Sequence, residues 1–291
     1  MVSLSVPQIG RSPRARGCWR LAFASLVALS PQLTSAEPVA VRHAEGNLHG
    51  FLVLRGPEGR LLADGDVVQT ARGDQISVHM TFHFKDGSQF DETTVFSQRQ
   101  QFKLVSYHLV QKGPAFPQSL DMSIDGANGD VAVSYSDDGA LKETRERFNV
   151  PPDLSNGMLG TLLKNVQSTT APKSVSLIAA TPRPRMIKLA IESAGRDSFV
   201  LGGAERRATH YVIKPEIGGL AGLLAPLAGK QPPDSHVWIL EGEMPVVVKA
   251  EQPFYVGSPL WRIELASPVW PNAPRVAEQN DDRVAAGRNS R

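Results

Sequence analysis

Apolar and polar side chains alternate along much of the chain between residues 48 and 266. In the clearest stretch, 75–85, apolar residues occupy every second position: Ile76, Val78, Met80, Phe82 and Phe84. A period of two predicts a β-strand with one buried and one solvated face. Arg-Gly-Asp before this stretch and Asp-Gly-Ser after it are turn sequences, so we expect the strand to end at both.

Similar patterns recur at short intervals and predict a series of strands. We expect them at 48–55, 60–71, 89–98, 102–112, 120–125, 131–136, 140–149, 174–181, 185–193, 198–201, 207–217, 236–241, 245–250 and 260–266. Tight-turn dipeptides such as Asn128-Gly129 and Asp138-Gly139 favour antiparallel hairpins. The stretch 102–112 has apolar residues at both odd and even positions, which predicts a strand covered on both faces.

One segment has helical spacing instead. After two prolines, apolar residues recur three or four positions apart, and Asp153 or Ser155 is a candidate N-cap: the stripe is Leu154, Met158, Leu159, Leu162, Leu163 and Val166. The sequence therefore predicts a mainly β (α+β) fold, in which a curved antiparallel sheet or open half-barrel wraps one central helix.

The N-terminus has the pattern of a secretory signal peptide. Four arginines precede an apolar run at 21–29, and Thr34-Ser35-Ala36 is a small-residue cleavage site. The run is shorter than the roughly 20 residues that span a bilayer. We therefore expect a signal peptide at 1–36, a single β-rich domain at 37–270, a disordered tail at 271–291, and a periplasmic location.

Charge and cysteine content exclude several classes of function. The chain has 31 basic and 29 acidic residues, but four of the arginines lie in residues 1–36, which leaves 27 basic residues and a net charge of −2. This balance argues against a nucleic-acid partner. Cys18 is the only cysteine, so the mature domain would have no disulfide, thiolate metal site or cysteine nucleophile.

The sequence gives little support for a metal site or a phosphate-binding site. His79 and His83 are about 13 Å apart if they lie on a strand, and no His-Glu-x-x-His segment occurs. Gly-x-Ser-x-Gly and phosphate-loop sequences are also missing. We predict no metal and no cofactor. The loop residues Arg183, Arg185 and Lys230 are either an anion site or ordinary surface cations.

Carboxylates are the remaining catalytic candidates. Asp64 and Asp66 would lie about 6.6 Å apart on one face of a strand, within the range of glycosidase pairs. Asp-Gly-Asp is also an ordinary turn sequence, and Asp91 and Glu92 would point to opposite faces. A glycan or ester hydrolase that uses these four acids is one alternative function.

Apolar segments point to a different role. Leu220, Leu223 and Leu224 would share one helical face in the glycine-rich segment 218–229, which either closes the core or forms an apolar lid or lipid-contacting patch. Aromatic residues are frequent in the C-terminal third, where core packing and a binding surface predict the same composition. The predicted ligand-binding residues are Phe102, Leu104, Tyr107, Leu159, Leu163, Leu220, Leu223, Leu224 and Trp238.

Several residue strings resemble a family of uncharacterised exported bacterial proteins. They are QKGPAFP at 111–117, PPDLSNG at 151–157, PRPR at 182–185, and GKQPPD at 229–234 with VWI at 237–239. The resemblance covers about residues 43–266 and implies no catalytic residue. More distantly, the predicted fold resembles the half-barrels of periplasmic lipoprotein carriers.

These observations predict an exported, non-enzymatic protein that binds an apolar or lipid-like ligand between sheet and helix. The expected partner is a lipid or hydrophobic small molecule, and peripheral contact with a membrane is compatible with this role. A second alternative, beside the hydrolase, is an interaction protein in envelope assembly.

Overall fold

The computed structural model describes residues 38–166, 173–201, 203–216 and 232–266, all within the unit Ala36–Arg291. The predicted signal peptide, the glycine-rich segment 218–229 and the C-terminal tail lie outside the described residues.

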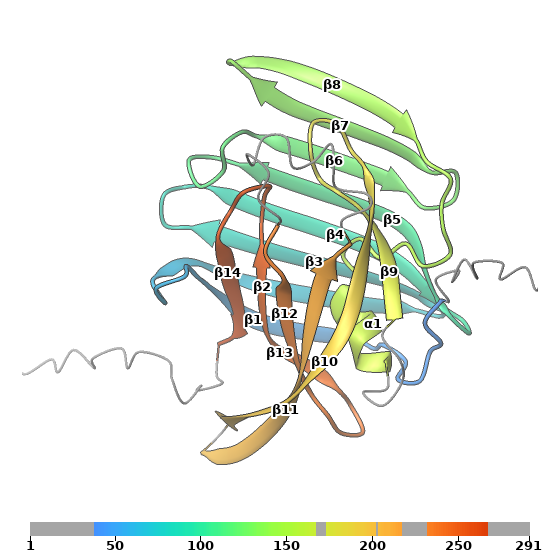
Figure 1. Cartoon of the computed structure of the whole chain (residues 1–291), viewed down its shortest axis with the longest axis vertical. Helices are drawn as coiled ribbons and strands as arrows, with labels where there is room; N and C mark the ends of the chain where they lie inside the picture. The colour runs from blue at the N-terminus through green and yellow to red at the C-terminus, as the bar shows by residue number, and fades with distance from the viewer. Residues whose placement is uncertain (1–37, 167–172, 202, 217–231, 267–291) are drawn as a thin grey trace, which may run out of the picture. The chain divides into compact units, whose positions relative to one another are not determined.

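Within these described ranges, fourteen β-strands form one antiparallel sheet (Figure 1). The first eight are β1 (Leu48–Arg55), β2 (Leu61–Arg72), β3 (Gln75–Phe84), β4 (Gln89–Gln98), β5 (Phe102–Lys112), β6 (Leu120–Asp125), β7 (Asp130–Asp137) and β8 (Ala140–Arg147). After the short helix α1 (Leu159–Asn165) come β9 (Lys173–Ile178), β10 (Met186–Leu201), β11 (Ala204–Pro215), β12 (Ser235–Leu240), β13 (Val246–Pro253) and β14 (Leu260–Leu265).

The order of strands in the sheet follows the chain with one exception. The sequence-consecutive meander β8 to β1 is joined to the meander β14 to β9 by pairing of β1 with β14, where Leu52 lies opposite Leu265. The sheet remains open, with β8 and β9 at its edges. The predicted fold class, a mainly β protein built on a curved, open antiparallel sheet, is confirmed.

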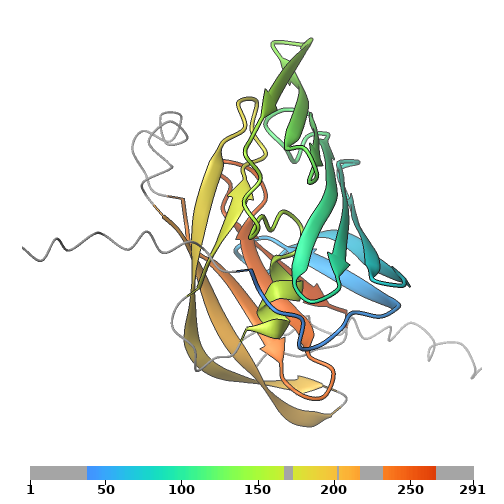
Figure 2. The same ribbon diagram turned by 90° about the vertical axis from the view of Figure 1, so that its right-hand side faces the viewer.

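The core lies on the inner face of this sheet, where the two meanders approach each other (Figure 2). Side chains that alternate along the strands meet there, and α1 adds the buried Leu162 and Leu163. An aromatic cluster fills one part of the interior: Phe82, Phe84, Phe90, Phe116, Phe254 and Trp261. The strict alternation predicted for β3 is therefore present, with Ile76, Phe82 and Phe84 buried.

The helix is shorter than the 154–166 stripe predicts, and this part of the prediction is wrong. Gly157 has φ +67°, a left-handed conformation that interrupts an α-helix. Neither Asp153 nor Ser155 caps α1: both instead hydrogen-bond Ser176 of β9. Leu154 and Met158 are nevertheless buried, so their spacing reflects core packing rather than helix.

The strand β5 is not covered on both faces, which corrects a second prediction. Its pairing with β4 passes from Val95 opposite Ser106 to Phe96 opposite Leu104, so Val105 is a bulge residue. The extra residue reverses the alternation, and Leu104 and Tyr107 both reach the inner face. Val105 is exposed on the other side. The bulge therefore explains why apolar residues occupy both odd and even positions in this stretch of the sequence.

Candidate functional site

A pocket of about 290 Å³ lies between the C-terminal end of α1 and the strands β11 and β12. We call it the helix-end pocket. Its apolar lining is Leu163, Val166, Ile239 and Pro245. Its polar lining is Arg42, His43, Lys164, Asn165, Tyr211 and Glu241, with Gly242 beside them. The pocket therefore joins a polar rim to the buried side chains Leu163 and Ile239.

Asn165 holds the N-terminal segment against the end of the helix. Its Oδ1 accepts hydrogen bonds from the main-chain N–H groups of Arg42 (2.8 Å) and His43 (2.7 Å). Nearby, Lys164 forms an ion pair with Glu45 at 2.5 Å, and both side chains are largely buried. These contacts fix one wall of the pocket, because they join segments more than 100 residues apart in the sequence.

The pocket wall on the sheet carries a buried tyrosine. Burial raises the pKa of Tyr211, and the nearby Glu241 raises it further, so this phenol stays neutral at physiological pH. Glu241 itself accepts hydrogen bonds from Arg196 at 2.7 Å and from Thr209. The polar lining thus combines three basic residues, Arg42, His43 and Lys164, with Glu241, whose carboxylate is already paired with Arg196.

A second polar pair lies on the inner face, on β4 and β5. The Tyr107 hydroxyl donates a hydrogen bond to Glu92 at 2.8 Å. Burial raises the pKa of Glu92, although the Tyr107 hydrogen bond opposes that shift. The pKa of Tyr107 is raised well above 10.0 by burial and by the neighbouring carboxylate. Burial therefore favours the neutral forms of both groups.

Replacing Glu92 with glutamine should remove a pH-dependent loss of stability. Because the folded-state pKa of Glu92 is raised, its contribution to stability is complete below the ordinary value of 4.5 and is lost as pH rises through the raised pKa. Glutamine has no charge to desolvate and can still accept the Tyr107 hydrogen bond. The variant should therefore melt at a higher temperature than the wild type at pH 7, and this difference should shrink towards pH 4. A constant difference across that range would contradict the assignment.

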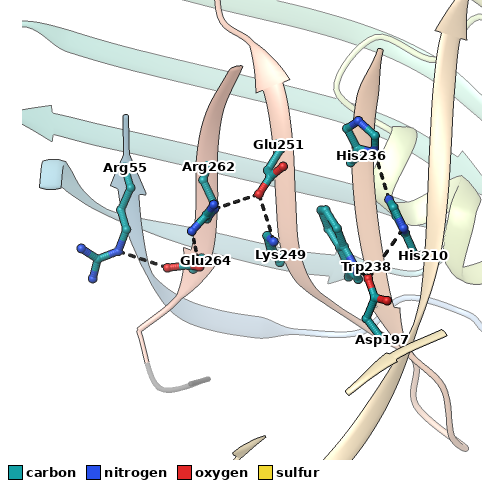
Figure 3. Close-up of polar contacts among 9 residues, drawn as sticks. All are labelled: Arg55, Asp197, His210, His236, Trp238, Lys249, Glu251, Arg262 and Glu264. Carbon is teal, nitrogen blue, oxygen red and sulfur yellow. Dashed lines mark hydrogen bonds and ion pairs between the residues drawn. The ribbon is translucent and has the colours of Figure 1, made fainter. Parts of the chain in front are cut away.

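The outer face of the same sheet carries a separate network (Figure 3). Arg55 of β1 donates to Glu264 of β14 at 3.1 Å, and Arg262 donates to Glu251 of β13 at 2.8 Å. Glu251 also pairs with Lys249 at 2.9 Å. Burial opposes ionisation of Glu251, but these two cations outweigh it and lower the pKa. Opposite charges thus alternate across three neighbouring strands, as in other cross-strand ladders.

This network ends in an aromatic stack. The Trp238 ring stacks on His210 at 4.3 Å, has the Lys249 ammonium 3.9 Å from its centre, and donates from Nε1 to Asp197. His210 is also hydrogen-bonded to His236 at 2.9 Å. Partial burial lowers the pKa of His210 and favours its neutral ring, and a hydrogen bond between two imidazoles requires that at least the accepting ring be neutral.

The described members of the predicted ligand-binding set lie in two separate apolar clusters. Phe102, Leu104, Tyr107 and Leu163 are buried in the main core, and Leu159 is packed against it. Trp238 belongs to a second cluster with Phe199, Ala208 and Val248. Leu220, Leu223 and Leu224 lie outside the described residues. Of the six described residues of this set, only Leu163 lines the helix-end pocket.

Three of the four candidate acids lie on the outer face of neighbouring strands, and Glu92 lies on the inner face. Asp66 contacts His49 (3.4 Å) and Asp91 contacts His79 (2.9 Å) on the outer face, whereas Glu92 faces the core. Asp64 is exposed on β2, where Asp-Gly-Asp forms part of a regular strand rather than a turn. Asp66 and Asp91 both lie opposite Thr81, but none of the four carboxylates lines the helix-end pocket.

The remaining candidates are the metal ligands, the cations of the proposed anion site and a second groove. In the described part of the chain, no group of three or more His, Cys, Asp or Glu side chains could hold a metal ion. Arg183 and Arg185 are exposed, and Lys230 is outside the described residues. A larger groove of about 890 Å³ runs along the outer face of β5 to β8, past His108, Ser123 and Arg145.

Most of the pocket residues were missed by sequence reasoning. Arg42, His43 and Lys164 have no motif spacing, because they come together only when the N-terminal segment crosses the end of α1. The one available signal was Asn165, a polar residue next to the apolar stripe of the helix.

No helix in the described ranges is long and apolar enough to cross a membrane. Comparison of the chain with protein-family models, curated proteins and solved structures gave no match in any of the three.

Proposed function

We propose that this chain is an exported, non-enzymatic binding protein that takes an apolar or lipid-like ligand between α1 and the sheet. The observation that carries the proposal is the helix-end pocket, which lies between these two elements and is lined by both polar and apolar side chains. An amphipathic molecule has the same division into an apolar chain and a polar head.

The size of the pocket suggests which part of the ligand it takes. Its volume of about 290 Å³ is close to the lower limit of ligand pockets, which range from about 300 to 1,000 Å³. We infer that it accommodates the head and first carbons of a chain. Leu163 and Ile239 would contact the carbons, and Arg42 and Lys164 would lie near an anionic head.

Export is the second part of the proposal and rests on the sequence. Residues 1–36 combine basic residues, a short apolar run and a small-residue cleavage site, and the rest of the chain lacks cysteine. We propose that the mature domain works in the periplasm, where lipid-like molecules must cross an aqueous space between two membranes.

Gly242 offers a direct test of the pocket. No atom lies within 4 Å of an ideal Cβ at this position, so a side chain can be introduced at the pocket without a clash at its Cβ. The Gly242→Trp variant should weaken binding of a fluorescent long-chain fatty acid by about tenfold or more, equivalent to roughly 1.4 kcal/mol. Titration of the purified protein with this probe measures the effect.

Gly46 supplies the matched control. It also has no atom within 4 Å of an ideal Cβ, and it does not line the pocket. Gly46→Trp should bind the probe as the wild type does. The proposal fails if the wild type shows no saturable binding, or if Gly242→Trp binds with unchanged affinity.

A further inference from the structure

The two edges of the sheet differ in how they are protected. At β9, the segment 153–156 lies alongside the strand: Ser155 and Asp153 exchange main-chain hydrogen bonds with Ser176, and the Asn156 amide bonds both main-chain groups of Ile178. At the other edge, β8 pairs with β7 on one side, and none of the described strands pairs with its free side (Figure 1). Every residue of β8 is exposed except Thr144, which is half-buried.

The main-chain groups that β8 presents at this edge can be identified. Phe148 N–H donates to Gly129 O at 2.9 Å, and hydrogen-bonded pairs alternate along an antiparallel ladder. The even-numbered residues of β8 therefore bond β7. Leu141, Glu143, Arg145 and Arg147 direct their N–H and C=O groups to the open edge, where they can pair with another strand.

We propose that β8 pairs with β8 of a second copy of this chain, antiparallel and about a twofold axis at Thr144. In this register Lys142 lies opposite Glu146 of the second copy, and Glu143 lies opposite Arg145. The same two contacts are repeated by symmetry, so four pairs of opposite charge form with no pair of like charge.

The neighbouring registers lack this complementarity. A twofold axis perpendicular to the sheet keeps the inner faces of both copies on the same side. Such an axis passes midway between the two copies of one residue, which therefore lie opposite each other. Centring the axis on Lys142, Glu143, Arg145 or Glu146 places two identical charges opposite each other. Thr144 is the uncharged residue among these five positions, and its register also lets the odd-numbered residues hydrogen-bond across the axis.

Charge reversal tests the interface. The wild type should have twice the mass of the chain by light scattering. Glu143→Arg alone and Arg145→Glu alone each turn two attractive pairs into repulsive ones, so each variant should be monomeric. An equimolar mixture of the two should give a heterodimer, because positions 143 and 145 then carry two arginines in one chain and two glutamates in the other. Circular dichroism should stay unchanged, since both side chains are exposed.

A cysteine tests the register independently. Thr144 would form a non-hydrogen-bonded pair with its own copy, with Cα atoms about 4.5 Å apart, a distance that a disulfide can bridge. In a Cys18→Ser background, Thr144→Cys should oxidise to a covalent dimer on non-reducing gels. Leu141→Cys is the control: the two copies of this exposed residue would lie about 20 Å apart and should not crosslink.

Three results would overturn the proposal. The first is a monomeric wild type, which would mean that the charges of β8 only prevent other strands from pairing with it. The second is a mixture of the two charge variants that stays monomeric. The third is equal crosslinking through residues 141 and 144. These outcomes are independent of fatty-acid binding, so the interface and the pocket can fail separately.

Discussion

Replacing Gly65 with alanine should lower the free energy of unfolding by about 3 kcal/mol. Gly65 lies within β2, opposite Phe82 of β3, and an ideal Cβ at this position would be 2.2 Å from the main-chain oxygen of Thr81. The same Cβ would be 2.4 Å from Cδ1 of Phe82, a ring with no exposed surface. Because one obstacle is backbone and the other is a buried ring, the strands themselves must move. Urea unfolding followed by circular dichroism measures the loss.

Gly50 is the matched control in the neighbouring strand. An ideal Cβ there would be 3.3 Å from Cγ1 of Val67 and 3.8 Å from Cδ2 of Leu265, contacts that small side-chain movements relieve. Gly50→Ala should therefore unfold within about 1 kcal/mol of the wild type. Similar losses in both variants would show that crowding against Phe82 is not what requires glycine at position 65.

Replacing Asn156 with alanine should cost about 3 kcal/mol. The buried Asn156 amide donates to Ile178 O at 2.8 Å and accepts from Ile178 N–H at 2.9 Å, so it takes the place of a strand at the edge of β9. Alanine leaves both main-chain groups of Ile178 without a partner in a place that water hardly reaches. The loss should appear in urea unfolding and as faster hydrogen exchange at the Ile178 amide.

Asn47 provides the comparison for this effect. Its side chain accepts a hydrogen bond from Ala71 N–H at 2.8 Å, but on an exposed surface where water can replace it. Asn47→Ala should cost less than about 1 kcal/mol. If the two alanine variants lose equal stability, the burial of Asn156 is not responsible for its effect.

The strands were the most predictable part of the fold. Residues 89–98, 102–112 and 120–125 end where the alternation of apolar and polar residues predicts. One face of the sheet is buried against the core, so each strand must place its apolar residues at every second position. Glycine-containing turns then divide the pattern into segments.

The departures have local physical causes that hydrophobicity alone does not show. The bulge at Val105 shifts the alternation by one residue, and the left-handed Gly157 stops a stripe of helical spacing before it becomes a helix. In both places the apolar residues are buried as expected, but the backbone that brings them there is irregular. Burial was therefore easier to predict than conformation.

The candidate site was less predictable than the fold. Leu163 was expected at a ligand, whereas Arg42 and His43 reach the same pocket through contacts with Asn165 that span 123 and 122 residues. Such contacts depend on the tertiary arrangement of the folded sheet. A single sequence contains no periodicity that records them.

The pairing of β1 with β14 has a consequence for the order in which the protein folds. The other ladders of the sheet join strands that follow each other along the chain, so each meander can assemble from short-range contacts. Among the ladders of the described strands, only this one brings together partners as distant as Arg55 and Glu264, which are 209 residues apart. Closing so long a loop carries the largest entropic cost of any ladder here. We therefore expect two preformed half-sheets to meet late, with seam closure as the slow step that completes the interior.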